Sequence, residues 1–392
     1  MHLPYGRQTI DDDDIAAVCA ALKSDWLTGG PLVDQYEAAF AAAVGAKHAI
    51  ACNSGTAALH LAVLGLDLKP DETVIVPTLT FLASANVVRM AGADVLFADV
   101  DADTGLLTPD TLQASIEVAK KMGVSVRAAI PVHLNGQICD LIGLSQIAKK
   151  HQIALIEDAC HALGESNVGA AEYSIAACFS THPVKAIATG EGGVVATADE
   201  NFAARLRRLR NHGMTRNPVE FENADLAFAD DEPNPWYYEM HEIGWNYRLP
   251  DVLCALGISQ LRKLDRFVTR RREIAALYER LLAPLAPAIR PVSRANAVHG
   301  WHLYVIQVDF KSLGASRGRV MKELREVGVG TQVHYIPVHK QPYYSQMYGD
   351  IVLPGADAYY ARCLSIPMFP SMKDADVERV VSALSRIVGK IG

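Results

Sequence analysis

The sequence lacks a long apolar run, a basic arm and a leader-like start, and each absence excludes a class of protein. Its longer apolar runs, such as residues 38–44 and 153–156, fall far short of the roughly 18 residues that a membrane span needs. The first residues, Met-His-Leu-Pro-Tyr-Gly-Arg, show no basic segment followed by an apolar one, so we expect no secretory signal. The 37 basic and 44 acidic residues are spread along the chain, and with a net charge of −7 nucleic acid is not an expected partner.

Cysteine is also sparse, and its spacing suggests no pairing. There are seven cysteines, an odd number, and none of them forms a CxxC pair. Such usage is typical of reduced thiols in the cytoplasm, which is the location that we expect.

The acidic run at residues 11–14 suits the positive end of a helix dipole, so we interpret it as a helix start rather than a metal site. We therefore expect no bound metal.

The length of the chain points to two domains. One hydrophobic core seldom grows past about 250–300 residues, and this chain has 392 residues with ordinary globular composition, 50% hydrophobic and 21% charged. We predict a large domain over residues 11–250 and a smaller domain over residues 251–392. Residues 1–10 are expected to pack with the smaller domain.

Apolar runs alternate with helical patterns through the first half of the chain. This alternation is typical of a mostly parallel sheet that is covered by helices on both faces. We expect seven strands, at residues 48–52, 73–76, 94–98, 128–132, 153–156, 177–180 and 193–197. We expect helices at residues 11–24, 32–44, 57–66, 81–91, 109–121, 141–151 and 202–211. The predicted fold class is therefore α/β.

The pattern changes after residue 215. Residues 216–245 are irregular and rich in acids, and the aromatic cluster at residues 236–238 favours a packed loop. A long helical stretch is expected at residues 250–285, and we interpret its three arginines at residues 270–272 as a solvated helix face. Beyond it we expect a smaller α+β unit, with strands at residues 303–308 and 331–334 and helices at residues 317–327 and 374–388.

The turn after the first strand is suited to binding an anion. Residues 53–56, Asn-Ser-Gly-Thr, stand between that strand and a helix. The first N–H groups of a helix have no partner inside the helix, and together with the helix dipole they favour a negative group. We expect Gly55 and Thr56 to contribute to such a site.

Two further segments carry candidate catalytic groups. Lys185 lies in a short polar turn between two buried strands, where desolvation lowers the pKa of an amine and a neutral amine can form a Schiff base. The strand at residues 153–156 ends in Glu157 and Asp158, at the edge where ligands of parallel sheets bind. Periodicity alone does not choose between these two acids. A phosphate cup, a carboxylate for a ring nitrogen and an amine for an aldehyde are together what pyridoxal 5′-phosphate (PLP) requires.

With these motifs the chain resembles the DegT-type nucleotide-sugar aminotransferases, which are PLP enzymes of fold type I. The resemblance covers nearly the whole chain, and two positions depart from the family pattern: Ala188, where many members have Thr, and Asn135, where an aromatic residue is frequent. The matching motifs stand at residues 26–31, 53–59, 77–81, 158–161, 179–193, 244–249 and 333–335.

The resemblance implies a role for individual residues. Lys185 would be the Schiff-base lysine, and Asp158 would be the partner of the pyridine nitrogen. Phe81 would stack on the cofactor ring, with His161 beside it near the phenolic oxygen. The phosphate would be bound by Gly55, Thr56 and Ser180. Asn246 would reach the phosphate of the neighbouring subunit's cofactor, so the resemblance also implies a homodimer with shared active sites.

Within the family, the lysine segment is most similar to the 4-aminotransferases of pseudaminic acid biosynthesis. These enzymes move the amino group of L-glutamate to the C4 ketone of a UDP-linked 4-keto-6-deoxy-N-acetylhexosamine, which leaves 2-oxoglutarate. Thr28, His334 and Tyr335, together with the loop at residues 216–245, are candidates for contacting the nucleotide sugar. Amination of another nucleotide sugar at C4 is the main alternative.

Two other readings belong to different classes. A sugar dehydratase of the same fold would carry histidine in place of the Schiff-base lysine, and Lys185 argues against it. A non-catalytic PLP-binding regulator would usually carry an added DNA-binding unit, and no basic appendage is visible in this sequence.

Overall fold

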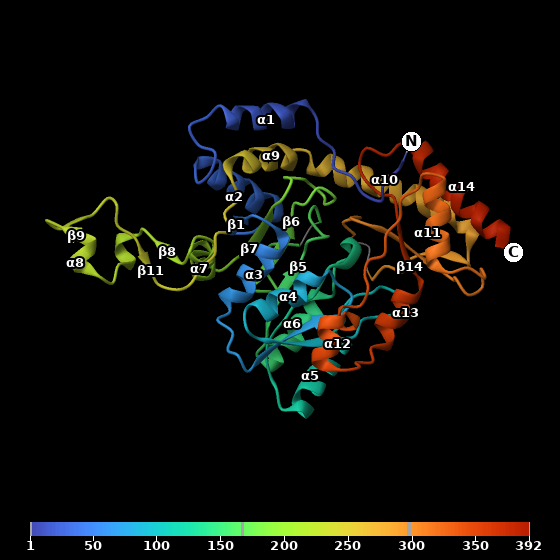
Figure 1. The fold of residues 1–392 in the computed structure, drawn as a ribbon, viewed down its shortest axis with the longest axis horizontal. Coiled ribbons are helices and arrows are strands. Elements are labelled where there is room, and N and C mark those ends of the chain that lie inside the picture. Colours follow the sequence, from blue (N-terminus) through green and yellow to red (C-terminus); the bar gives the residue numbers. More distant parts are fainter. Residues whose placement is uncertain (1, 166–167, 296–298, 392) are drawn as a thin grey trace.

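A seven-stranded sheet lies at the centre of the larger part of the molecule, in a computed structural model that describes residues 2–165, 168–295 and 299–391 (Figure 1). Its order is β1-β7-β6-β5-β4-β2-β3, and β7 runs antiparallel to its two neighbours while the other pairs are parallel. The predicted mostly parallel sheet is therefore confirmed. The strands are β1 (His48–Cys52), β2 (Glu72–Pro77), β3 (Asp94–Ala98), β4 (Ser125–Ala129), β5 (Ala154–Asp158), β6 (Ala176–Ser180) and β7 (Gly193–Thr197).

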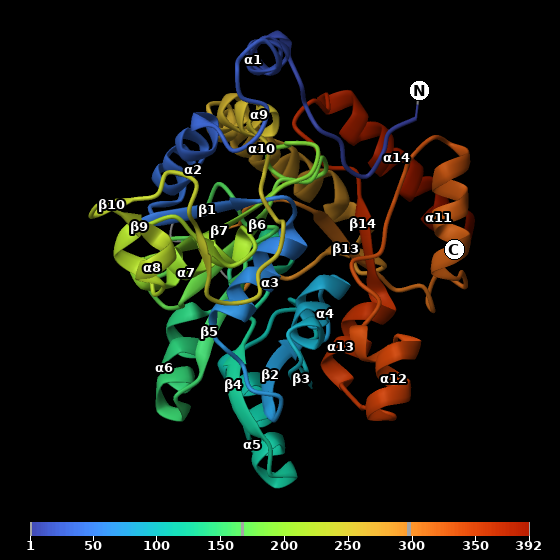
Figure 2. The same ribbon diagram turned by 60° about the vertical axis from the view of Figure 1, so that its left-hand side comes forward.

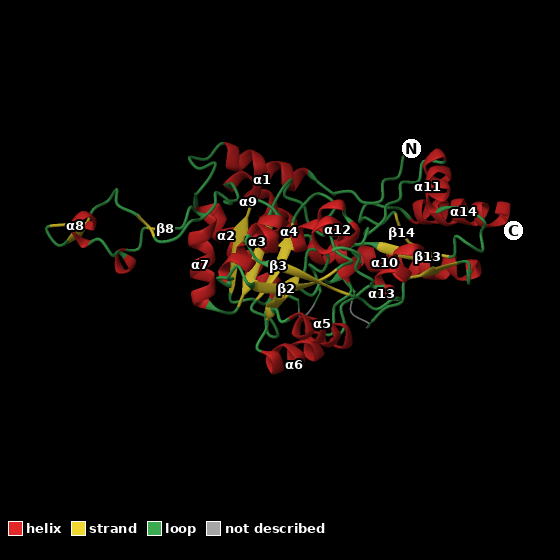
Figure 3. Cartoon of the chain, turned by 60° about the horizontal axis from the view of Figure 1, so that its bottom comes forward, coloured by secondary structure: helices red, strands yellow, loops and turns green. Residues whose placement is uncertain are grey.

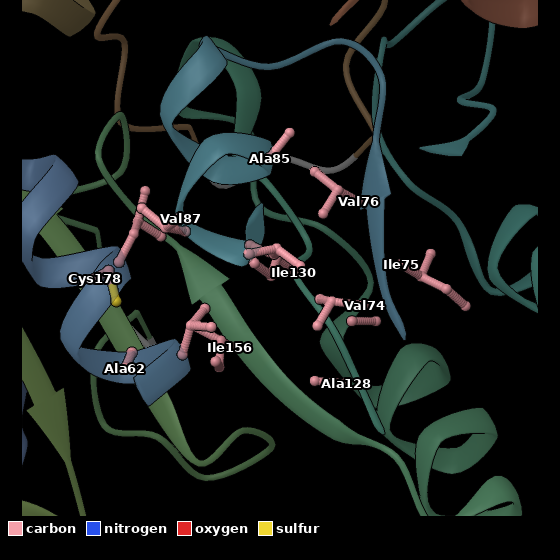
Figure 4. Close-up of a cluster of buried hydrophobic side chains, with 14 of the residues drawn as sticks. Ala62, Val74, Ile75, Val76, Ala85, Val87, Ala128, Ile130, Ile156 and Cys178 are labelled. Carbon is pink, nitrogen blue, oxygen red and sulfur yellow. The ribbon is translucent and has the colours of Figure 1, made fainter. Parts of the chain in front are cut away.

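Both faces of this sheet are covered. Successive residues of a strand point to opposite faces, and on β1 the adjacent residues Ile50 and Ala51 belong to two different hydrophobic clusters. On β2, Val74 and Val76 point to one side and Ile75 to the other, and all three are fully buried (Figure 4). A strand that is apolar on both faces is typical of a parallel sheet between two helical layers.

Helices connect these strands, and several of them begin at a side chain that caps the first turn. In α5, for example, Thr108 caps the first turn, Pro109 occupies the first helical position and Gly123 ends the helix in a left-handed conformation. The helices of this part are α1 (Asp12–Leu22), α2 (Pro31–Val44), α3 (Gly55–Gly65), α4 (Leu82–Met90), α5 (Pro109–Met122), α6 (Leu141–His151) and α7 (Glu200–Arg210), with a 3-10 turn at Leu134–Gly136.

The C-terminal part has a separate core around a three-stranded antiparallel sheet of order β12-β13-β14. Its strands are β12 (Ile289–Pro291), β13 (Tyr304–Val308) and β14 (Cys363–Ile366). The helices that follow residue 250 are α9 (Asp251–Leu261), α10 (Leu264–Leu282), α11 (Arg317–Glu326), α12 (Pro342–Tyr348), α13 (Pro354–Arg362) and α14 (Asp374–Ile391), with 3-10 turns at Ala283–Leu285 and Val338–Lys340.

The two parts are joined by the N-terminal segment and by α9. Leu3 forms a parallel bridge with Val329 and is buried in the C-terminal core, as far as the described residues of the N-terminal segment show. In turn, α9 packs against α1 and α2, and α1 lies along α9 in Figure 1 and next to it in Figure 2. The division into domains at residue 250 stays a proposal, and the contacts of α9 favour placing that helix with the larger part.

Several local predictions were wrong. The long helix ends at Leu261 and restarts at Leu264, so it is two helices. Residues 331–334 are not a strand, because Gln332 alone pairs with Ser365 before the chain turns into a cavity wall. The arginine run is not uniformly solvated: Arg271 is only 1% exposed and donates to three backbone carbonyls, those of Trp301, His302 and Met368.

Residues 214–243 form an arm that projects from the body (Figures 1 and 3). The expected packed loop was wrong in this respect, because Trp236 is 74% exposed and Tyr238 is 52% exposed. Only part of the arm packs on itself, where the rings of Phe221 and Tyr237 lie 4.9 Å apart. Its short elements are β8 (Met214–Thr215), α8 (Ala224–Ala227), β9 (Phe228–Ala229), β10 (Glu232–Pro233), β11 (Glu239–Met240) and a 3-10 turn at Pro218–Glu220.

Candidate active site

A cavity of about 650 Å³ opens beside the C-terminal ends of β5 and β6 and the N-terminus of α3. This is the edge at which open α/β sheets bind their ligands. The cavity brings together nine of the residues singled out in the sequence, from positions far apart in the chain. They are Gly55, Thr56, Phe81, Asp158, His161, Ser180, Lys185, His334 and Tyr335.

One wall of the cavity is the N-terminus of α3. Ser54 caps the helix by accepting from the N–H of Ala57, and the carbonyl of Ser54 accepts from the N–H of Ala58. The N–H groups of Gly55 and Thr56 are thereby left for a ligand. Gly55 is required here, because a Cβ at that position would lie 2.7 Å from the Cβ of Ser180. The helix start and the Ser180 hydroxyl line the same cavity and together could hold a phosphate.

Asp158 ends β5 and lines the cavity. Its Oδ2 accepts from the hydroxyl of Ser84 at 2.7 Å, and its Oδ1 accepts from the N–H of Cys160 at 3.2 Å. These two donors hold the carboxylate in one orientation. In this orientation it could pair with a positively charged ring nitrogen bound in the cavity.

Glu157 faces the opposite side of the same strand. Its side chain is 2% exposed, lies 3.0 Å from Nε2 of His133 and accepts from the hydroxyl of Ser174 at 2.5 Å. Because successive strand residues alternate between faces, only one of the two acids can line the cavity. The geometry thus distinguishes the two acids that periodicity left open.

Lys185 lies in the turn between β6 and β7 and lines the same cavity as Asp158. Burial lowers the pKa of its amine below the ordinary value, and the nearby Asp158 carboxylate opposes this shift. An amine with a lowered pKa is more often neutral near pH 7, which is the form that attacks an aldehyde.

His161 is held in one tautomer. Its Nδ1 accepts from the backbone N–H of Asn135 at 3.2 Å, so the neutral ring carries its proton on Nε2, which lies 3.1 Å from the Tyr335 hydroxyl. Burial, helped by the positive charge of Lys185, holds the pKa of His161 well below its usual range, so the ring stays neutral. Since Tyr335 accepts from His161, its own hydroxyl proton is available to the cavity.

Two predicted residues lie elsewhere. Thr28 and Asn246 are both exposed and do not line the cavity within the described chain. Asn246 bridges to Asn211, and its carbonyl accepts from the Asn53 side chain at 3.5 Å. A single chain therefore does not bring these two residues to the site.

Sequence reasoning missed two residues of the site. Tyr5 lines the cavity with its ring 5.5 Å from that of His334, although it stands in a segment without periodicity. Ser84 is hidden in an ordinary helical pattern, and only its place three residues after Phe81, one helical turn on, could have drawn attention to it.

The donor set fits PLP. A helix start with a hydroxyl suits its phosphate, a fixed carboxylate suits its ring nitrogen, and a lysine amine suits its aldehyde. Among the described residues no group of three or more His, Cys, Asp or Glu side chains is arranged to hold a metal ion. No helix in the described ranges is long and apolar enough to span a membrane.

Comparison with known proteins places these features in a family. The model of the DegT/DnrJ/EryC1/StrS aminotransferase family matches residues 8–385. The chain is 39% identical over 391 residues to the spore coat polysaccharide biosynthesis protein SpsC of Bacillus subtilis (strain 168), with 98% of this chain and 97% of SpsC covered.

Solved structures agree over the whole length. PseC of Helicobacter pylori, an aminotransferase involved in the biosynthesis of pseudoaminic acid, superposes with a TM-score of 0.88 at 26% identity and full coverage of both chains. The PLP form of Spr1654 from Streptococcus pneumoniae gives a TM-score of 0.87 at 26% identity, again with both chains fully covered.

Proposed function

The chain belongs to the DegT/DnrJ/EryC1/StrS aminotransferase family and is a PLP-dependent sugar aminotransferase, and from this premise we propose that it aminates a nucleotide sugar at C4. In this proposal L-glutamate is the amino donor and leaves as 2-oxoglutarate. The acceptor is a UDP-linked 4-keto-6-deoxy-N-acetylhexosamine. The observation that carries the proposed chemistry is the single cavity that holds Lys185, Asp158 and the start of α3.

The role of each residue follows from its position. Bound PLP supplies an aldehyde that takes up the amino group and a ring that delocalises an electron pair. The Asp158 carboxylate, fixed by Ser84, would hold a proton on the ring nitrogen. The α3 N-terminus and Ser180 would bind the phosphate, and Phe81, at the mouth of the cavity, would pack over the ring.

Lys185 is the proposed proton carrier. Its amine can take the proton from Cα of the donor and, in the second half-reaction, deliver one to C4 of the sugar, because the two reactions are chemical reverses of each other. The lowered pKa of this amine favours the neutral form that accepts a proton. Tyr335, whose hydroxyl proton is directed by His161, can donate to an oxygen of the substrate.

The choice of sugar is supported by likeness alone. The match to PseC, named for pseudoaminic acid biosynthesis, favours the UDP-linked acceptor. The higher identity to SpsC, named for a spore coat polysaccharide, favours the alternative that a different nucleotide sugar is aminated. A dehydratase is disfavoured because a lysine lines the cavity.

A homodimer is part of the proposal. Lys185 is the only lysine or arginine among the described residues that line the cavity, although the substrate carries a diphosphate. A second copy would supply further polar groups, including Asn246, and would cover exposed apolar residues of the arm such as Trp236 and Ile243. Because all seven cysteines are free, we propose a cytoplasmic enzyme.

The function is tested by mixing the PLP-loaded protein with glutamate and a panel of UDP-, dTDP- and GDP-linked 4-keto sugars. NMR of the product identifies the amino sugar and the configuration at C4. We expect turnover with the UDP-linked N-acetylated sugar. Faster turnover of another 4-keto sugar would replace the proposed acceptor, whereas elimination without amine transfer or an absence of turnover would refute the aminotransferase mechanism of this site.

A further inference from the structure

The turn that carries Lys185 is only partly held by its own hydrogen bonds. Its ends are tied together, because the N–H of Thr189 donates to the carbonyl of Thr181 and the hydroxyls of these two threonines lie 2.6 Å apart. Near the front, the N–H of Lys185 donates to the carbonyl of His182. The stretch that follows Lys185, residues 186–188, depends on contacts from other parts of the chain.

Gln260 on α9 makes such a contact. Its side chain is buried, with 1% of the residue exposed, and its Oε1 accepts from the backbone N–H of Ala188 at 3.2 Å. Its Nε2 donates to the carbonyl of Thr9 at 3.0 Å and to Oδ2 of Asp14 at 2.7 Å. The partners fix the orientation of the amide, because a backbone N–H can only donate and the two oxygens can only accept.

The N-terminal segment presses on the same turn from another side. Gly6 lies so close to the turn that a Cβ there would be 3.4 Å from the Cβ of Val184. Residues 7–9 surround a small void of about 10 Å³ together with residues 185–188 and Gln260. With so little free space behind Lys185, the turn has few alternative positions as long as Gln260 holds Ala188 and Thr9 together.

We propose that Gln260 is a positioning residue for Lys185. It fixes the backbone three residues beyond the lysine and couples it to α9 and to the N-terminal segment. The inference rests on the proposed function of Lys185, because only a lysine that must reach both substrate atoms and PLP needs this precision. An amide is suited to the task, since one planar group offers an acceptor to the turn and two donors, one to the N-terminal segment and one to α1.

The chain offers a matched control in the preceding residue. Ser259 is also buried and donates to Oδ1 of Asp14 at 2.7 Å, but no hydrogen bond of its side chain reaches the lysine turn. Ser259→Ala therefore weakens the contact between α9 and α1 alone. Gln260→Met has nearly the same size as glutamine and removes the contacts to Ala188, Thr9 and Asp14 together.

The test uses the PLP-loaded enzymes. Gln260→Met should lower kcat by roughly 10- to 100-fold, as expected for a small misplacement of a catalytic group, with little change in the KM for glutamate. The pH titration of the visible absorbance of the bound cofactor should shift as well, because Lys185 no longer holds one position. Ser259→Ala should lower the midpoint of thermal unfolding and leave both kcat and this titration unchanged.

Gln260→Glu is the second variant. It keeps Oε1 as an acceptor for the Ala188 N–H, and Lys263, 2.8 Å from Asp14, offsets part of the added charge. It should retain more of kcat than Gln260→Met even where it is no more stable, so the pair separates loss of positioning from loss of stability. Should Gln260→Met not fold, Gln260→Glu is compared directly with wild type and Ser259→Ala, and it should show a shifted titration that Ser259→Ala does not. The proposal is overturned if Gln260→Met keeps wild-type kcat and titration, if Ser259→Ala loses as much, or if Gln260→Glu retains no more of kcat.

Failure of the underlying function has a different signature. If Lys185 does not bind PLP, the visible cofactor band is either absent from the wild-type protein or unchanged in Lys185→Ala. In that case all three variants lack the titration, whereas failure of the Gln260 proposal leaves a normal wild-type titration that the substitutions do not move.

Discussion

Two adjacent carboxylates at the end of β5 occupy different environments because a strand alternates its side chains. Asp158 lines the cavity and is oriented by Ser84, whereas Glu157 is buried against His133 and Ser174. Asp158 can therefore form an ion pair with a ligand in the cavity, whereas Glu157 can only stabilise the position of the strand. The difference gives each acid its own test.

Asp158→Asn should lower kcat by roughly 10²-fold or more, because a neutral amide no longer holds a proton on the ring nitrogen. Glu157→Gln should leave kcat nearly unchanged and lower the free energy of unfolding by about 1–3 kcal/mol, because it weakens buried hydrogen bonds. Steady-state kinetics and urea denaturation of both variants provide the measurement. A larger loss of kcat in the glutamine variant would assign the ring nitrogen to Glu157.

Buried histidines near the cavity make stability depend on pH. Burial lowers the pKa of His334 to about 3, helped by the charge of Lys185, and burial also holds the pKa of His302 well below its usual range. Below pH 6.5 the unfolded chain takes up protons at these positions and the folded chain does not. The free energy of unfolding should therefore fall as the pH drops from about 6.5 toward 4.

His334→Asn should remove part of this dependence. Between pH 6 and pH 5 the slope of unfolding free energy against pH should decrease by about 1.4 kcal/mol per pH unit, the value of one proton. The amide can keep the hydrogen bond that His334 Nδ1 shares with Ser365. Urea denaturation at each pH measures the slope. Near pH 8, the reference, wild type and variant should have the same slope of unfolding free energy against pH. An unchanged slope would contradict the assignment.

At this scale the sequence predicted the residues whose chemistry is tied to a motif and missed those defined by packing. Gly55 could be recognised because it stands between a strand and the start of a helix, and Lys185 because it stands in a short turn between two buried strands. Few other roles fit these residue types at such positions. Tyr5 and Gln260 could not, since nothing local distinguishes them. The prediction for Arg271 was wrong for the same reason. Its neighbours on α10 are partly solvated, and only the tertiary structure shows that it is buried and donates hydrogen bonds to three backbone carbonyls.

Among the elements, the arm projects from the body, and one of its carboxylates makes four polar contacts within it. Glu239 accepts from the backbone N–H groups of Glu222 and Asn223 and from the Tyr237 hydroxyl, and it lies 2.9 Å from Nε2 of His241. Burial alone would raise the pKa of Glu239, but these hydrogen bonds outweigh it and lower the pKa to about 2. The carboxylate is thus ionised throughout the neutral range and ties β11 to the segment that precedes α8.

Glu239→Ala should make the arm much more sensitive to limited proteolysis, with cleavage between residues 214 and 243. The midpoint of thermal unfolding of the body should change little, because the arm contributes few buried apolar contacts. Glu222→Ala is the control, since it removes an equal charge from the arm and keeps the backbone N–H that binds Glu239. Equal cleavage of both variants would show that loss of charge, rather than loss of the acceptor, loosens the arm.

The elements themselves were predictable where period and caps agree. The strands at residues 48–52, 94–98 and 193–197 match the expected bounds, and so does α6. The segment at residues 331–334 has β-branched residues at alternate positions, Thr331 and Val333, which suggests a strand, yet only Gln332 pairs with β14, at Ser365, before the chain lines the cavity. The break between α9 and α10 has no proline or glycine to announce it, and a helical pattern on both sides concealed it.

For the whole molecule, the positions of Thr28 and Asn246 decide whether one chain is enough. Both lie on the surface, outside the cavity, and the arm exposes Trp236 beyond the body. If Asn246 serves the site of a second copy, the two sites of a dimer each draw residues from both chains. Such sharing can be tested by complementation.

Lys185→Ala and Asn246→Ala should each be inactive or strongly impaired alone. Co-refolded as an equal mixture, they should recover about a quarter of wild-type activity, because half of the dimers are mixed and each mixed dimer holds one intact site. Activity of the mixture that equals the mean of the two parents would show that the sites are not shared. Sedimentation of the mixture confirms that dimers are present during the assay.

The N-terminal segment has a consequence for the order in which the protein can be completed on the ribosome. Leu3 is bridged to Val329, and Thr9 is held by Gln260, so these residues meet their partners only after a much later part of the chain has been made. Until then the segment at residues 3–9 lacks these contacts, and the lysine turn lacks its hydrogen bond to Gln260. The active site can therefore be complete only after His334 and Tyr335, which also line the cavity, have been made.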